Sequence, residues 1–181
     1  MLTLDCDVIY HDLLKNNADL NSELRACFTV ASHDGVTDLK QLGEMVFNDP
    51  PALLELNAIT HKYVGEEVNR QIADWKSKGG KVAAIDAIAL IESGIAKKCD
   101  VIIGVTAPEE IRILRIMVRD GITRKQAKTR INAQKPDSYY AEYCDYLLEG
   151  KSGRPAEFEK ECMDFFAGLL HRQGENDNDG Q

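Results

Sequence analysis

The chain has 181 residues, of which 44% are hydrophobic and 29% charged, and its formal net charge is -8. This length suits a single domain with a sizeable core, and the composition excludes a disordered or fibrous protein. No apolar run reaches the roughly 20 residues of a membrane helix, and the first residues lack the pattern of a secretory signal. The acidic balance argues against a protein that coats nucleic acid or an anionic membrane. Five scattered cysteines without a CxxC pair argue against a disulfide framework or a zinc site, so we expect a protein of the reducing cytoplasm.

The first half of the sequence is predicted to be mostly helical. The expected elements are the end of a buried strand at residues 2–4 and helices at about 8–15, 19–26, 39–47 and 50–78. Asp19 and Asp38 stand where N-caps are needed, and Pro50 is suited to the first turn of the long helix. Residues 33–35 carry a turn signal.

The second half alternates strands with helices. Buried strands are expected at 81–86, 100–106 and 146–148, and helices at about 108–119, 123–133 and 157–170, followed by a polar tail over 172–181 that we expect to be disordered. This alternation predicts an α/β protein with a parallel sheet, in which ligands bind at the carboxyl ends of the strands.

Carboxylates follow two of the predicted strands. Asp5 and Asp7 come directly after the first strand, and Asp86 ends the strand at 81–86 with Glu92 a short way on. Such carboxylates can hold a metal, position a hydroxyl or act as a general base. Helix caps and ordinary surface acids explain the same residues equally well. His61 lies on a mainly apolar helix, where a half-buried histidine with a structural role is the simpler interpretation.

A strongly basic segment interrupts the acidic chain. Residues 112–135 contain eight basic residues and one acid, a net charge of +7, so the remainder carries -15. Arg112, Arg115 and Arg119 share one face of a predicted helix. Guanidinium groups match phosphate oxygens, so this face predicts an anion site, although a solvated helical surface is the alternative.

Taken in order, five segments resemble the dephospho-coenzyme A kinase family across about residues 2–170. LDCDVIYHDLL at 4–14 looks like that family's strand-end Asp-Ala-Asp segment, and residues 34–64 are similar to its stretch ending in Leu-x-x-Ile-x-His. AIDAIALIESGI at 84–95 looks like the Pro-Leu-Leu-x-Glu element, with Ile88 in place of the proline. Residues 99–134 resemble the strand, helix and Arg-rich lid that end in Arg-Ile-x-x-Gln, and 144–150 fall at the last strand.

The resemblance implies a three-layer P-loop kinase fold in one domain over 1–171, with a helical acceptor-binding insertion over about 8–78 and an Arg-rich lid over about 119–140. It implies phosphorylation of the ribose 3'-hydroxyl of dephospho-coenzyme A by ATP and Mg²⁺, with Asp7 as the base and Arg119 as a catalytic lid residue. The positions that would line or shape the acceptor pocket are Asp5, His61, Asp86, Leu90 and Glu92. Those that would contact the nucleotide phosphates are Arg112, Arg115, Arg124, Arg130 and Gln134.

The family's phosphate-binding motif is the main departure. No GxxxxGK(S/T) occurs in the 181 residues, although in a P-loop kinase it must precede the Asp-x-Asp segment. We therefore expect that the first central strand of the sheet is missing from this sequence, that ATP binding is compromised without it, and that an in-frame glycine-rich loop lies upstream in the gene. The alternatives are a non-catalytic protein that binds dephospho-coenzyme A or a nucleotide, and another nucleotide or nucleoside kinase.

Overall fold

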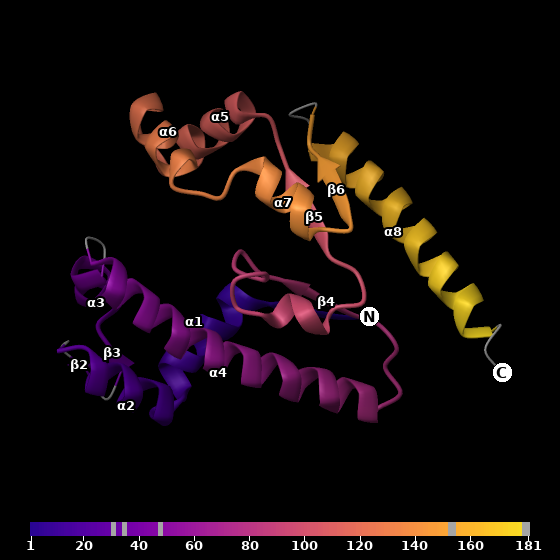
Figure 1. Ribbon diagram of the computed structural model, residues 1–181. Helices are drawn as coiled ribbons and strands as arrows, with labels where there is room; N and C mark the ends of the chain where they lie inside the picture. The colour runs from indigo at the N-terminus through magenta and orange to yellow at the C-terminus, as the bar shows by residue number, and fades with distance from the viewer. Residues whose placement is uncertain (30–31, 34–35, 47–48, 152–154, 179–181) are drawn as a thin grey trace. The chain divides into compact units, whose positions relative to one another are not determined.

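The computed structural model describes residues 1–29, 32–33, 36–46, 49–151 and 155–178. The chain forms two compact units, Met1–Cys99 and Asp100–Gln181, which are described separately (Figure 1). No helix among the described residues is both long and apolar enough to cross a membrane. Asp34 and Gly35 of the predicted turn, and Phe47 at the end of a predicted helix, lie outside the described residues.

The first unit is a parallel strand pair with four helices. Its elements are β1 (Leu2–Asp5), α1 (Cys6–Asn16), α2 (Ala18–Cys27), β2 (Ser32–His33), β3 (Val36–Thr37), α3 (Leu39–Val46), α4 (Pro50–Ser77), β4 (Ala83–Asp86) and the 3-10 helix η1 (Ile95–Lys98). β1 and β4 are parallel and in register, so that Asp5 lies opposite Asp86 at their carboxyl ends. β2 and β3 form a short antiparallel hairpin. The predicted helices of this half are all present.

Side-chain caps fix where these helices begin. The Asp5 carboxylate accepts hydrogen bonds from the backbone amides of Asp7 and Val8. The Asp38 carboxylate accepts them from the amides of Lys40 and Gln41, and the Asp49 carboxylate accepts one from the amide of Ala52. The prediction of Asp38 as a cap is confirmed.

The prediction of Asp19 as a cap is wrong. Asn17 leaves the helical conformation (φ -99°, ψ 107°), and its side chain accepts a hydrogen bond from the Leu20 amide. α1 and α2 are therefore separated by one extended residue, and Asp19 lies in the first turn of α2.

Two apolar clusters make the core of the first unit, and α4 contributes to both. One joins α1, α2, α3 and α4 through residues that include Leu20 and Leu24, both fully buried. The other packs Leu4 of β1 against Ile9 of α1 and Val68 of α4. Burial of each such side chain stabilises the fold by about 1.5–3 kcal/mol. The long helix α4 thus supports both the helical part and the strand pair, as Figure 1 shows.

A buried amide joins α2 to the hairpin. The Asn21 Nδ2 donates to the carbonyls of Leu14 (2.7 Å) and Asn17 (2.9 Å), and its Oδ1 accepts the backbone amide (2.9 Å) and hydroxyl (2.8 Å) of Thr37. Asn21 and Thr37 are the buried polar residues of the described chain. All four hydrogen-bonding positions of the Asn21 side chain are filled, as a buried amide requires.

Replacing Asn21 with alanine is expected to lower the free energy of unfolding by about 2–4 kcal/mol, because the Thr37 and Leu14 groups stay buried without partners. Urea unfolding would measure the loss. The exposed Asn16, whose amide group donates to the Asp12 carboxylate (2.8 Å), provides the control: Asn16→Ala should change stability by less than about 0.5 kcal/mol. Equal losses in the two variants would contradict the structural role of Asn21.

The second unit is a second parallel strand pair with helices. Its elements are β5 (Ile103–Thr106), α5 (Glu109–Asp120), α6 (Arg124–Asn132), α7 (Asp137–Tyr143), β6 (Tyr146–Glu149) and α8 (Pro155–Asn178). β5 and β6 are parallel, and in Figure 1 this pair lies between α7 and α8. The alternation of strands and helices confirms the predicted α/β class. α8 extends to Asn178, into the segment 172–181 for which the sequence predicts a polar, disordered tail. Once a helix has formed, each further residue gains one backbone hydrogen bond in return for the conformational entropy that it loses, so α8 can continue beyond its apolar part.

The α5–α6 turn is fixed by its sequence. Gly121 ends α5 in the left-handed conformation (φ 64°), and Thr123 begins α6 with a capping box in which its side chain and that of Gln126 each bond the other's backbone. The predicted Thr123 cap is confirmed. Ile113, Ala127 and Ile131 form the buried contact between the two helices.

Strand pairing is limited in both units. Among the described strands, β4 pairs with β1 and β5 pairs with β6, and each has no other hydrogen-bonded neighbour. The parallel sheet expected from the sequence is thus present as two pairs.

Candidate active site

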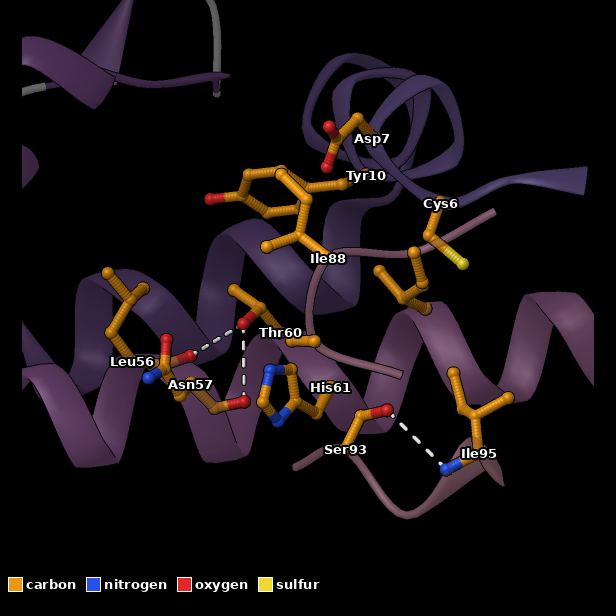
Figure 2. A pocket seen from close by; sticks show the side chains of 13 residues that line it. Cys6, Asp7, Tyr10, Leu56, Asn57, Thr60, His61, Ile88, Ser93 and Ile95 are labelled. Carbon is orange, nitrogen blue, oxygen red and sulfur yellow. Dashed lines mark hydrogen bonds between the residues drawn. The ribbon is translucent and has the colours of Figure 1, made fainter. Parts of the chain in front are cut away.

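A cavity of about 290 Å³ opens in the first unit between α1, α4 and the turn that follows β4. Asp7 and Tyr10 reach it from α1, and Asn57, Thr60 and His61 from α4 (Figure 2). The apolar part of the wall consists of Leu56, Val64, Ala87, Ile88, Ala89 and Ile95. A cavity with apolar walls and a few polar groups at fixed positions is typical of a small-molecule site.

Helix geometry explains why these side chains meet. Asp7 and Tyr10 are three residues apart on α1, and Asn57 and His61 are four apart on α4, so each pair shares one helix face. The Thr60 hydroxyl donates to the carbonyls of Leu56 (2.9 Å) and Asn57 (3.2 Å), which fixes its orientation in the wall. The Asp7 carboxylate has no hydrogen bond or ion pair with any described residue, and it is exposed, so it is available to a ligand.

Acids gather at the carboxyl ends of β1 and β4. Burial raises the pKa of the Cys6 thiol, and the charges of Asp5, Asp7 and Asp86 raise it further. The three carboxylates are therefore near enough to a buried thiol to keep it neutral. Asp5 is a helix cap, which is one of the interpretations that the sequence left open, and it borders a different hollow on the far side of α1 with Asp12 and Glu67.

The cavity keeps its two aromatic polar groups neutral. Burial raises the pKa of Tyr10, which remains a phenol that can donate a hydrogen bond. Burial lowers the pKa of His61, and the charge of Glu92 opposes that effect only in part. At neutral pH the cavity therefore offers an uncharged imidazole, with one nitrogen as donor and one as acceptor.

The basic segment of the second unit is paired with acids. Arg119 donates to the Asp120 carboxylate through Nε (2.7 Å) and Nη2 (3.0 Å), and Arg130 bonds the same carboxylate through Nη1. The remaining pairs are Arg124 with Glu110 (2.6 Å), Lys128 with Glu109 (3.3 Å) and Arg112 with Asp137 (3.4 Å). Arg115 and Gln134 are exposed, and the buried Arg112 Nε has no hydrogen-bond partner among the described residues.

These pairs reduce the excess charge that the sequence suggested. Glu109, Glu110 and Asp137 lie just outside the basic segment, and over 109–137 the chain has eight basic and four acidic residues, a net charge of +4. Hydrogen bonds from the arginines lower the pKa of Asp120 and of Glu110, so both acids stay ionised. The surface is still positive, and four of its arginines are paired with carboxylates: Arg112, Arg119, Arg124 and Arg130.

Comparison with known proteins identifies the family. The family model for dephospho-CoA kinase (CoaE) matches residues 1–155. The chain belongs to the dephospho-CoA kinase family. A dephospho-CoA kinase of Dehalococcoides mccartyi is 31% identical over 168 residues, covering 91% of this chain and 82% of that protein. One of Lactobacillus johnsonii is 29% identical over 163 residues, covering 89% and 82%.

Solved structures share the fold. The crystal structure of TT1252 from Thermus thermophilus matches with a TM-score of 0.73 and 26% identity, covering 93% of this chain and 84% of that one. A dephospho-CoA kinase from Campylobacter jejuni matches with a TM-score of 0.65 and 23% identity, covering 93% and 85%. The α/β fold of the dephospho-CoA kinase family therefore extends over most of the chain.

The structure brings together some of the predicted pocket residues. Asp7 and His61 line the cavity, and Glu92 lies close enough for its charge to act on His61. Asp86 is at the strand end beside Asp5. Leu90 does not line the cavity, and its carbonyl accepts the Ser93 hydroxyl and the Ala96 amide within the turn. The sequence interpretation missed the lining residues Tyr10, Asn57, Thr60 and Ser93. Each of them is within four residues of a predicted site residue.

His61 is expected to make stability depend on pH. Its folded pKa lies below the unfolded value of about 6.5, so the neutral form is favoured by folding. The contribution is present above that value and is lost as the pH falls through it. His61→Gln should therefore unfold with a flatter pH dependence than the wild type between about pH 7 and 5, as measured by urea midpoints. His11→Gln, at an exposed position of α1 outside the cavity, is the control for the loss of an imidazole from the surface.

Proposed function

We propose that this chain binds dephospho-CoA in the cavity of its first unit and transfers a phosphoryl group from ATP to the ribose 3'-hydroxyl, which gives coenzyme A. The observation that carries the proposal is that Asp7 and His61, two positions named by the family resemblance, line one cavity in a chain of the dephospho-CoA kinase family.

The size of the cavity supports binding of one part of the acceptor. A volume of about 290 Å³ is near the lower end of the range for ligand pockets. It suits the adenosine end of dephospho-CoA, with the pantetheine arm extending outward. The apolar walls fit a purine ring, and Asn57, Thr60 and the neutral His61 supply hydrogen bonds for its polar edge or the ribose.

Asp7 is assigned as the general base. Its unpartnered carboxylate accepts the proton of the 3'-hydroxyl as that oxygen bonds to the terminal phosphorus of ATP and the bond to the leaving ADP oxygen breaks. The arginines of α5 and α6, with Arg119 foremost, are assigned to neutralise the phosphate charge. Phosphoryl transfer needs little covalent help from a protein, so this positioning and charge neutralisation supply most of the catalysis.

Magnesium stays a prediction. No group of three or more His, Cys, Asp or Glu side chains in the described parts of the chain is arranged to hold a metal, and Asp5 is engaged by backbone amides. We therefore assign no magnesium ligand and derive no step through the ion. The three-layer P-loop architecture, the single domain over 1–171 with its acceptor insertion and lid, and the cytoplasmic location also remain predictions.

A second candidate is a protein that binds dephospho-CoA without turnover, which the cavity of the first unit would equally permit. Calorimetry with dephospho-CoA and a coupled assay of ADP formation separate the two. Binding together with acceptor-dependent ADP formation supports the kinase, and binding without ADP formation by the gene product supports the second candidate. A folded protein that binds no dephospho-CoA would contradict both. Nucleosides and nucleotides as alternative acceptors test whether another kinase activity is present.

A further inference from the structure

Asp120 occupies an unusual place in the basic part of the second unit. It is the last residue of α5, directly before the Gly121 turn, and its carboxylate bonds arginines from two helices, Arg119 of α5 and Arg130 of α6. Its side chain is only 20% exposed, although the arginines are 72% and 55% exposed. The most enclosed member of this group is therefore the acid.

We propose that Asp120 is a positioning residue that holds Arg119 and Arg130 together as one clamp for a nucleotide polyphosphate. Two guanidinium groups brought close without an anion repel each other and lose side-chain conformational freedom. A shared carboxylate offsets both costs before any phosphate arrives. The inference rests on the proposed function for the identity of the ligand, and on the contacts of Asp120 for its role.

The contacts leave the arginines able to bind a phosphate. A guanidinium has five N–H donors. Asp120 uses the Nε and one Nη2 donor of Arg119 and one Nη1 donor of Arg130. Three donors of Arg119 and four of Arg130 remain, enough for bidentate contacts with phosphate oxygens. Asp120 therefore orients the two forks without occupying them.

Glu109 is a matched control on the same helix. Its carboxylate also pairs α5 with α6, through Lys128 at 3.3 Å. Glu109→Gln and Asp120→Asn each remove one negative charge and one α5–α6 ion pair, and each retains a side chain of the same size. Only Asp120→Asn loosens the two arginines. If net charge alone determined binding, both variants would bind anions more tightly than the wild type.

The test is calorimetric binding of tripolyphosphate to the whole chain, with circular dichroism to show that each variant is folded. Asp120→Asn should bind roughly tenfold more weakly than the wild type despite its more positive charge, because the clamp is no longer preorganised. Glu109→Gln should bind equally or slightly more tightly. Asp120→Glu, which keeps the charge, should return to within about threefold of the wild type. Equal or tighter binding by Asp120→Asn, or no binding by the wild type, would overturn the proposal.

A measurement on the unmodified protein covers the case in which Asp120→Asn does not fold. Tripolyphosphate should shift the side-chain Nε–H NMR signals of Arg119 and Arg130 together and leave that of Arg70 in the first unit unchanged. A response from Arg124 without Arg119 and Arg130 would overturn the clamp. Because tripolyphosphate binding needs no phosphoryl transfer, an inactive protein with the expected binding pattern would contradict the kinase function and leave the role of Asp120 supported.

Discussion

Asp7→Asn is expected to lower the kcat of ATP-dependent phosphorylation of dephospho-CoA by the gene product by about 10²–10⁴-fold. The amide has nearly the same size as the carboxylate, so the cavity keeps its shape and KM should change little. It cannot accept the hydroxyl proton, so the loss falls on the chemical step. Steady-state ADP formation at varied dephospho-CoA separates kcat from KM.

Asp12→Asn is the matched control for this prediction. Asp12 is an exposed acid on the same helix, outside the cavity, and removal of its charge changes the net charge of the chain equally. We expect its kcat to stay within about twofold of the wild type, since surface substitutions have small effects. Equal losses in the two variants would show that the acidity of α1, and not a proton acceptor at position 7, supports the reaction.

The local rules of the chain made much of the fold predictable. Asp38 and Thr123 could be recognised as caps because a short polar side chain directly before an apolar helical pattern has few other roles. Pro50 marked the start of α4 because the fixed φ of proline suits the first turn of a helix and no backbone N–H is needed there. The β-branched runs before Asp86 and Thr106 are too short and too apolar for surface helices, so β4 and β5 were evident. Asn17 was missed because Asp19 is also a good cap, and only the backbone break after α1 decides between them.

Elements that depend on tertiary contacts were less predictable. α7 has no side-chain cap and no buried residue, so its sequence lacks both a cap signal and an apolar helical pattern. Its aromatic residues contact one another: the ring centroids of Tyr139 and Tyr143 are 4.8 Å apart. The cavity was also difficult to predict, because it too depends on tertiary contacts. Asp7 and His61 could be named separately, but their meeting depends on the packing of α1 against α4, which no local pattern encodes.

The net charge of the basic segment is the property for which the sequence alone was most misleading. The window 112–135 leaves out Asp137, the partner of Arg112, and it also leaves out Glu109 and Glu110, the partners of Lys128 and Arg124. A helix pair brings residues together across its turn, so partners lie outside any window drawn around the basic residues alone. The pairing changes the expected chemistry from a diffuse positive surface to a few oriented donors.

Arg119→Ala is therefore expected to have a larger effect than the loss of one positive charge. An arginine that stabilises the charge of a transferring phosphoryl group contributes about 10³–10⁵-fold to kcat, and its removal also leaves Asp120 with Arg130 as its only arginine partner. We expect a loss of about 10³-fold, mainly in kcat, because the charge on the phosphoryl oxygens is redistributed in the transition state.

Lys125→Ala removes the same charge from an exposed position on α6 and should change kcat by less than about threefold. Arg119→Lys keeps the charge but presents a point cation in place of the planar fork, so it should recover only a small part of the loss. If Lys125→Ala lost as much as Arg119→Ala, the segment would act as a diffuse positive field. If Arg119→Lys were fully active, charge alone would suffice at this position, and the oriented pair of donors held by Asp120 would have no part in the transfer step.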